Sequence, residues 1–341
     1  MSQSQPEPSP LLFFETVSAY QRSAAMKAAV ELDIFTHIGA GQTSASALAA
    51  ACGAAERGVR ILCDYLVVIG FLNKQDGHYQ LTQDSAVFLD RRSPAYMGGA
   101  IEFLLSPMLV DNFRDLTAAV RKGGTTMTEA GTIAPEHPVW VQFARAMAPM
   151  MAMPAQVMAQ LISEQAPTDR NVKVLDIAAG HGAFGIAVAR QMPNAEVTAL
   201  DWPNVLQVAE ENARNAGVGD RHRLLPGSAF EVDYGSGYDF VLLTNFLHHF
   251  DPQTCEQLLR KVRAALADGG RAITLEFIPN EDRVSPRGAA MFSMTMLGST
   301  PHGDAYTFSE LEQMFSNAGF TRSVLHPLPA DYPQQLVLSE K

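Results

Sequence analysis

The sequence predicts an α/β protein in which a mostly parallel sheet follows an N-terminal winged-helix domain. From residue 171 onward, short apolar runs alternate with helical patterns, which is typical of a parallel sheet covered by helices on both faces. Before residue 93, helical segments are followed by a short hairpin, which is the order of a winged helix. We therefore expect a winged-helix domain over 11–92, a helical connector over 93–167 and the α/β domain over 168–341.

The composition indicates a globular cytoplasmic protein. The 341 residues are 47% hydrophobic and 18% charged, which is enough apolar material for a substantial core. The first ten residues lack the basic and apolar regions of a signal peptide, and no apolar run approaches the roughly 20 residues that span a bilayer. Cys52, Cys63 and Cys255 show no C-x-x-C spacing. We expect neither a disulfide framework, a metal site nor a membrane partner.

Each element of the N-terminal domain has its own signal. Apolar residues at helical spacing predict one long helix or two short ones over 11–38, and further helices over 45–51 and 55–69. The pair Asp76-Gly77 then supplies the positive φ values that a tight hairpin turn needs. The hairpin strands are expected at 71–74 and 78–82.

A winged helix raises the question of nucleic-acid binding. The net charge of −11 opposes it, because affinity for nucleic acids depends mainly on Lys and Arg. The third helix carries Arg57 and Arg60 but also Glu56 and Asp64, and the hairpin adds only Lys74. We expect no nucleic-acid partner. A homodimer that buries the apolar first helix is the favoured role, and a ligand-sensing winged-helix regulator is the alternative.

The connector and the sheet follow in order. The connector has a methionine-dense segment over 147–158, which suits either ordinary core packing or a pliable apolar wall for a flat substrate. Strands are expected at 172–177, 196–200, 222–225, 240–243 and 271–277, and helices at 184–192, 203–216 and 252–267. A last helix over 309–318 precedes two short strands near 322–326 and 335–338 that would pair as a terminal hairpin.

The most informative motif is a buried strand that runs into a glycine-rich turn at 174–185. Read literally, it contains G-x-G-x-x-G, which in a dehydrogenase would hold the pyrophosphate of NAD. Asp176 at the strand end would crowd two phosphates but would suit a cofactor that carries an ammonium group. We therefore expect S-adenosylmethionine. After the next strand, Asp201 lies where a carboxylate accepts hydrogen bonds from ribose hydroxyls.

With these motifs in place, nearly the whole chain resembles the S-adenosylmethionine-dependent small-molecule O-methyltransferases. They include the plant caffeate and acetylserotonin enzymes and bacterial natural-product relatives. The resemblance implies a class I methyltransferase domain, a homodimer formed by the N-terminal domain, and adenine binding at 227–230. Plant members commonly have an acidic residue where this chain has Ser228. The cofactor residues it implies are Asp176, Gly180, Gly182, Asp201, Trp202, Ser228, Ala229, Phe230 and Asn245.

The same resemblance implies a catalytic base. Counting back from Cys255 places His248 at the base position, and Glu276 matches its acidic partner. Adjacent strands place groups at their ends about 5 Å apart, so a carboxylate there can fix one imidazole tautomer. A second family Glu is replaced by Ala305, so either Asp304 supplies that charge or Glu276 acts alone.

The resemblance also implies the acceptor side of the pocket. Its expected residues are Phe143, Met147, His249, Met294, Met296 and His302. We expect methyl transfer to a hydroxyl of a small, aromatic or polyketide-like metabolite. A C- or N-methyltransferase on the same scaffold is the alternative, because such acceptors could use a less demanding base. The purely structural alternative is that His248 and His249 only bond the strand end.

Overall fold

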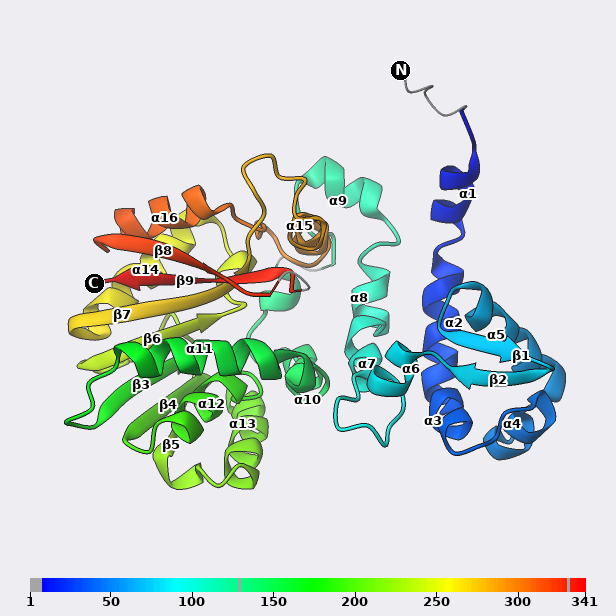
Figure 1. Ribbon diagram of the computed structural model, residues 1–341. Helices are drawn as coiled ribbons and strands as arrows, with labels where there is room; N and C mark the ends of the chain where they lie inside the picture. Colours follow the sequence, from blue (N-terminus) through cyan, green and yellow to red (C-terminus); the bar gives the residue numbers. More distant parts are fainter. Residues whose placement is uncertain (1–7, 128–129, 330–331) are drawn as a thin grey trace, which may run out of the picture. The chain divides into compact units, whose positions relative to one another are not determined.

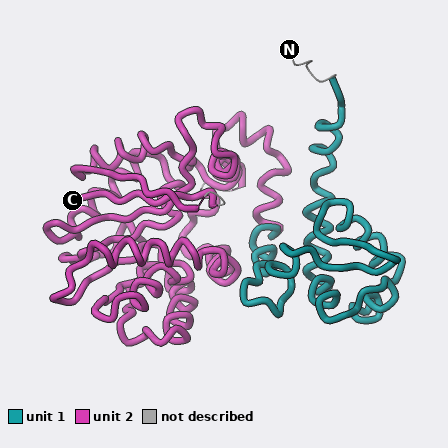
Figure 2. The backbone as a smooth tube through the Cα atoms, in the orientation of Figure 1, with its two compact units in different colours: residues 1–106 teal, residues 107–341 magenta. Residues whose placement is uncertain are grey.

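The computed structural model describes residues 8–127, 130–329 and 332–341. The chain divides into two compact units, residues 1–106 and residues 107–341 (Figure 2). The domain boundaries expected after residues 92 and 167 stay predictions. In the described ranges, no helix has both the length and the apolar character needed to cross a membrane.

The first unit is a winged helix, as predicted (Figure 1). Its helices are α1 (Leu11–Val17), α2 (Tyr20–Glu31), α3 (Ile34–Gly39), α4 (Ala45–Cys52), α5 (Glu56–Val68), α6 (Gln83–Phe88), η1 (Gly98–Ala100) and α7 (Ile101–Leu104). Strands β1 (Leu72–Gln75) and β2 (His78–Leu81) form the antiparallel hairpin. Asp76 and Gly77 have φ values of 50° and 80°, which confirms the predicted turn.

The prediction of one or two helices over 11–38 was wrong, because the chain forms three there. The second interruption is at Asp33, whose left-handed φ of 51° ends the helical run before α3. Behind it, Phe35, Leu48 and Leu66 are buried in the core of this unit. The large apolar side chains of α1 are all exposed instead.

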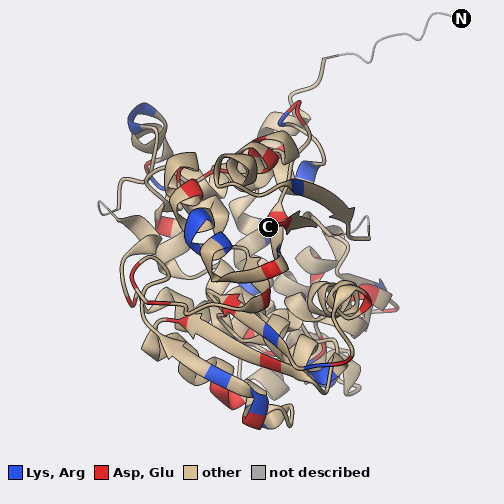
Figure 3. Cartoon of the chain, turned by 90° about the vertical axis from the view of Figure 1, so that its left-hand side faces the viewer, with Lys and Arg blue, Asp and Glu red and all other residues tan. Residues whose placement is uncertain are grey.

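One cation of helix α5 and one of the wing are neutralised within the unit. Arg60 and Lys74 both pair with the Asp64 carboxylate, at 2.8 and 2.6 Å. Figure 3 shows basic and acidic residues interspersed along the chain. This pairing removes two of the cations that a phosphate backbone would need.

The second unit contains the predicted parallel sheet. Its strands are β3 (Val172–Ile177), β4 (Ala195–Asp201), β5 (His222–Pro226), β6 (Tyr238–Thr244), β7 (Leu266–Phe277), β8 (Arg322–Pro327) and β9 (Gln334–Glu340). The order in the sheet is β5-β4-β3-β6-β7-β9-β8, and the first five strands are parallel. The terminal hairpin is confirmed, with β9 inserted antiparallel between β7 and β8.

The helices of the second unit connect and cover these strands. They are α8 (Pro107–Asp111), α9 (Leu116–Lys122), η2 (Gly131–Ile133), α10 (Val139–Met147), η3 (Ala148–Met151), α11 (Ala152–Gln165), α12 (Ala183–Gln191), α13 (Pro203–Asn215), η4 (Gly219–Arg221), η5 (Leu247–His249), α14 (Pro252–Ala265), α15 (Arg287–Ser299) and α16 (Phe308–Asn317). Strand β7 begins at Leu266, five residues before the predicted strand, because Leu266 pairs with Tyr238 across an irregularity in the register.

Alternation along the central strand builds one core on each face of the sheet. In β3, Val172 and Val174 join the cluster beneath α11 and α12, whereas Leu175 and Ile177 join the cluster beneath α14 and α16. Figure 1 shows these two helix layers on opposite faces. Burial on both faces explains why the strand reads as a nearly continuous apolar run.

Candidate active site

The central strands of the sheet define a crevice at their carboxyl ends. β3 and β6 are neighbours, and the chain leaves them toward opposite edges of the sheet. Ligands of open α/β sheets bind at such a switch point. Ala178 and Asn245, which follow the two strands, both have left-handed φ values, of 55° and 53°. Backbone strain of this kind is common at functional sites.

The glycine turn after β3 contains one open and one packed glycine. A Cβ at Gly180 would find its nearest described atoms 3.9 Å away, including Cε1 of Phe143, so there is room for a ligand. A Cβ at Gly182 would lie 3.1 Å from the side chain of Ala209 in α13. Only Gly180 therefore fits the argument that glycine lets a ligand approach, while Gly182 permits helix packing.

Asp201, the last residue of β4, is fastened to the glycine turn. Its carboxylate accepts hydrogen bonds from the backbone N–H of Gly180 at 2.8 Å and of Trp202 at 2.7 Å. Burial raises its pKa to about 6, although these hydrogen bonds oppose the shift. A carboxylate has about four acceptor positions, so two remain for the hydroxyls of a ribose.

Asp176 has a different orientation from the one we expected. Its side chain is fully buried beneath α12, where Oδ2 accepts the Gly185 N–H at 3.1 Å. Even-numbered residues of β3 face this helix layer, so the carboxylate turns inward. Burial raises its pKa to about 7, and Oδ1 has no partner among the described residues. Attraction of a cofactor ammonium by direct contact with Asp176 is not supported, because the side chain is turned into the core.

Two side chains anchor the backbone of the predicted adenine segment, residues 227–230. Tyr234 Oη and Lys261 Nζ both donate to the carbonyl of Ala229. The Phe230 ring packs edge-on against Phe250, with centroids 5.0 Å apart, and remains partly exposed. Ser228 Oγ accepts the N–H of Phe230 and is thus occupied within the segment. The segment offers an aromatic surface and backbone groups rather than a charge. Trp202, the N-cap residue of α13, packs instead with Val205 and Val208.

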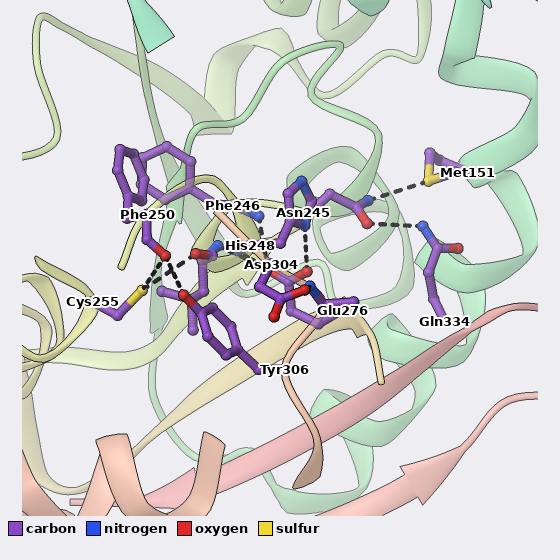
Figure 4. Close-up of polar contacts among 12 residues, drawn as sticks. Met151, Asn245, Phe246, His248, Phe250, Cys255, Glu276, Asp304, Tyr306 and Gln334 are labelled. Atoms are coloured by element: carbon purple, nitrogen blue, oxygen red, sulfur yellow. Dashed lines mark hydrogen bonds and ion pairs between the residues drawn. The ribbon is translucent and has the colours of Figure 1, made fainter. Parts of the chain in front are cut away.

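The structure brings His248 and Glu276 together at the ends of β6 and β7 (Figure 4). His248 Nδ1 lies 2.5 Å from Glu276 Oε2, and both side chains are buried. Glu276 Oε1 accepts the backbone N–H groups of Phe246, Leu247 and His248, at 2.9, 2.8 and 3.4 Å. One carboxylate therefore holds both the imidazole and the backbone of the turn that carries it. Since a carboxylate accepts, the Nδ1 atom carries the ring proton and Nε2 is left as the basic nitrogen.

Two further side chains hold this turn, and sequence reasoning assigned neither to it. Cys255 Sγ donates to the carbonyl of Leu247 at 3.2 Å. Tyr306 Oη donates to the carbonyl of Phe250 at 2.5 Å (Figure 4). Tyr306 lies 56 residues further along the chain than its partner. Short-range patterns carry no signal for such a contact.

Asp304 is engaged elsewhere. Its carboxylate pairs with Arg283 at 3.2 Å and accepts the N–H of Ala305. No hydrogen bond joins it to His248 in the part of the chain that the structure describes. The loop itself lies against the turn that carries His248, because a Cβ at Gly303 would lie 2.3 Å from the carbonyl oxygen of His248. The neighbouring His302 is exposed.

The expected acceptor residues divide into two groups. His249 is buried with its ring edge-on to Trp140 at 5.1 Å, and Phe143 also packs on Trp140. Burial and the neighbouring His248 hold the pKa of His249 well below its ordinary range, so this ring is neutral. Met147 is buried as well. On α15, Met296 is buried but Met294 is 47% exposed, because residues two apart lie on different faces of a helix.

Solved structures similar to this chain include methyltransferases. The crystal structure of a candidate O-methyltransferase from Nostoc punctiforme is similar to this chain, with 61% sequence identity. Its TM-score is 0.95, and the match covers 98% of this chain and 100% of that one. Human N-acetylserotonin methyltransferase in complex with S-adenosylmethionine has a TM-score of 0.84 at 21% identity, over 100% and 99% of the two chains. This chain therefore has the fold of a methyltransferase.

The family follows from sequence comparison. Residues 113–321 match the O-methyltransferase domain model, and residues 14–91 match the O-methyltransferase dimerisation domain model. The chain belongs to the O-methyltransferase family. It is also similar to the 3-hydroxy-5-methyl-1-naphthoate 3-O-methyltransferase of Streptomyces sahachiroi, at 27% identity over 91% of this chain and 89% of that protein. The predicted family and fold class are confirmed, and S-adenosylmethionine is the cofactor that this family uses.

Proposed function

We propose that this protein transfers the methyl group of S-adenosylmethionine to a hydroxyl of a small aromatic or polyketide-like metabolite, with His248 as the general base. The observation that carries this proposal is the buried contact of 2.5 Å between His248 Nδ1 and Glu276. A histidine held in one tautomer by a buried carboxylate is well suited to accept a proton.

The residues at the crevice fit the cofactor. Gly180 leaves open space above the turn, and Asp201 retains acceptor positions after bonding two amides. When bound there, S-adenosylmethionine supplies an electrophilic methyl group. Phe230 and the backbone around it would then face the adenine.

The reaction requires the acceptor hydroxyl to lose a proton as its oxygen attacks the methyl carbon. His248 Nε2 takes that proton, and Glu276 stabilises the imidazolium that forms. The C–S bond breaks in the same step, which leaves S-adenosylhomocysteine and the methyl ether. General base catalysis of this kind is typically worth about 10² to 10⁴ in rate. The half-buried rings of Phe277 and Phe292 pack edge-on against His248, with centroid distances of 6.2 and 4.8 Å.

The position of Asp304 favours a mechanism with one carboxylate. Its pairing with Arg283 leaves Glu276 as the acidic partner that touches the base. C- or N-methylation is the second candidate, because a base with a single carboxylate partner is sufficient for acidic carbon acceptors and for nitrogen acceptors. The site of methylation, read from the product by NMR, separates the two candidates.

We also propose a homodimer formed through the N-terminal unit. The match to a dimerisation domain supports it, as do the apolar side chains of α1, which are 60–74% exposed at Leu11, Leu12, Phe13, Phe14 and Val17. The cytoplasmic location stays a prediction.

The test is a screen followed by one substitution. Hydroxylated naphthoates and other phenols are incubated with radiolabelled S-adenosylmethionine, because the naphthoate enzyme is a relative of this chain. With an acceptor found, His248→Ala should lower kcat by about two orders of magnitude or more, while the Kd for S-adenosylhomocysteine stays within a few-fold. Unchanged turnover would remove His248 from the mechanism.

A further inference from the structure

A single guanidinium joins three segments of the second unit that are separate in sequence. Arg283 lies in the loop 278–286, which connects β7 to α15 (Figure 1). Its Nη1 donates to Asp304 Oδ2 at 3.2 Å, and its Nη2 donates to Oε1 of Glu310, a member of the capping box of α16. Among the residues that the structure describes, neither carboxylate pairs with another cation. The proposed reaction assigns no role to this arginine.

The loop backbone around Arg283 is held in an uncommon conformation. Its φ of 57° is left-handed, which a residue with a side chain rarely adopts. The Arg283 N–H donates to the carbonyl of Asn280 at 2.8 Å, and Glu281 accepts a hydrogen bond from the Ser309 hydroxyl on α16. Strained backbone persists where the surrounding structure holds it, and it is common at functional sites. The loop therefore offers a fixed point to which the segment that carries Asp304 is tied.

Asp304 lies between two contacts that support the turn that carries His248. Just before it in sequence, a Cβ at Gly303 would lie 2.3 Å from the carbonyl oxygen of His248, so the two backbones touch there. Just after it, Tyr306 donates to the carbonyl of Phe250. A displacement of Asp304 must therefore move the turn or break one of these contacts.

The arginine also separates two like charges. Asp304 and Glu310 bond the two terminal nitrogens of one planar group, so their carboxylates lie close together. Without the cation, the two carboxylates would repel each other and drive their segments apart. Asp304 itself makes no recorded contact with His248 within the described ranges, so the effect of this carboxylate on the base passes through the backbone.

We propose that Arg283 is a positioning residue for the proposed base. Through Asp304 it holds the 303–306 segment against the His248 turn, residues 246–250, and so keeps the imidazole at a fixed place. The second carboxylate that the sequence predicted then anchors a loop and is not a partner of the base. The inference rests on the proposed function, because it takes His248 as the group that accepts the proton.

The first test is a double-mutant cycle on the full-length protein, with an acceptor found in the screen. Arg283→Met removes the charge but keeps an unbranched side chain, and it should lower kcat by about fivefold, the upper range for a partly exposed ion pair. Asp304→Asn should lower kcat by about two- to threefold, because Glu310 still holds the guanidinium. The double variant should be no slower than Arg283→Met alone, since Asp304 acts through the arginine. Arg283→Lys restores a cation and should lie closer to the wild type.

The pH profile of kcat distinguishes positioning from a direct effect of charge. If Asp304 acted on the base by its charge, Asp304→Asn would move the acid limb of the profile to lower pH. Loss of the cation in Arg283→Met would move the same limb to higher pH. We expect the acid limb to stay in place in both variants, with only the height of the profile reduced. Opposite shifts of more than about half a pH unit would overturn the proposal.

Hydrogen exchange of the His248 turn gives a readout that needs no acceptor. Three backbone N–H groups of this turn bond Glu276, so they exchange slowly while the turn is in place. In Arg283→Met they should exchange about fivefold faster. Arg260→Met is the matched control, because the Arg260 side chain is 52% exposed against 43% for Arg283 and pairs with Glu256 on α14. Its exchange in residues 246–250 and its kcat should match those of the wild type.

The outcomes separate a positioning role from a merely structural one. A lower melting temperature of Arg283→Met with unchanged kcat and unchanged exchange would overturn the proposal. A loss of affinity for S-adenosylhomocysteine in step with kcat would mean general distortion and would overturn it as well. If His248→Ala keeps its turnover, or no acceptor is methylated, the proposed function fails, and the exchange measurement still decides whether Arg283 holds the turn.

Discussion

Exchange of Glu276 for glutamine tests the proposed catalytic pair of His248 and Glu276 with almost no change of shape. In the wild type, Oε1 accepts three backbone N–H groups and Oε2 faces His248 Nδ1. In Glu276→Gln, the three donors keep an oxygen at the first position, so the new amide NH₂ faces the imidazole. An amide NH₂ only donates. The ring must then accept at Nδ1 and carry its proton on Nε2, the atom that should take the proton of the acceptor.

The expected magnitudes follow from these contacts. A ring protonated on Nε2 offers no base, so kcat should fall by about 10² to 10⁴. The backbone of the turn keeps its acceptor, and charged hydrogen bonds are exchanged for neutral ones. The cost in folding free energy should therefore be about 1 to 3 kcal/mol, which leaves the protein folded.

Three measurements on the purified protein decide the matter. They are kcat with saturating acceptor, the Kd for S-adenosylhomocysteine, and the melting temperature. Glu256→Gln on α14 is the control, because its carboxylate pairs with Arg260 and Asn317 away from the strand ends. Glu276→Gln should lose turnover but keep the Kd within a few-fold, and the control should lose neither. The reasoning is refuted if kcat stays within twofold, or if affinity for the product falls in parallel with kcat.

The two remaining predictions concern stability and the support of the turn. Folded Asp176 keeps its proton up to about pH 7, whereas the unfolded group releases it near 3.8, so this group destabilises the fold as the pH rises between those values. The stability of Asp176→Asn relative to the wild type should therefore increase as the pH rises from 5 to 8, by at most about 4 kcal/mol. The measurement is the difference in melting temperature between the two proteins at each pH. A difference that stays constant with pH contradicts the raised pKa of Asp176. Tyr306→Phe removes the donor to the Phe250 carbonyl and should lower kcat several-fold without changing the Kd for S-adenosylhomocysteine. Tyr79→Phe in the wing is the control, because it loses a hydrogen bond to Asp64 and should lower only the melting temperature. Equal kcat values for the two variants would exclude a role of Tyr306 in supporting the turn that carries His248.

Several parts of the site were accessible from the sequence because the rules behind them are local or follow from sheet geometry. The Asp76-Gly77 turn depends on two residues and their φ values. The meeting of His248 with Glu276 depends only on parallel strands whose carboxyl ends share one edge. Sequence reasoning was weaker in predicting which face of a strand or helix a side chain lies on. Asp176 lies on the face of β3 beneath α12, and Met294 lies on the exposed face of α15.

The sequence by itself determined the α/β class, the winged helix, the order of strands and helices, and the edge of the sheet at which chemistry-bearing residues gather. These depend on hydrophobic period and on turn residues, which act over a few positions. Only the tertiary structure decided that Asp304 pairs with Arg283, and that Gln334 reaches Asn245 across 89 residues of chain. Such partners are selected by packing of whole elements against each other, and no local pattern records which side chains that packing brings within hydrogen-bond distance.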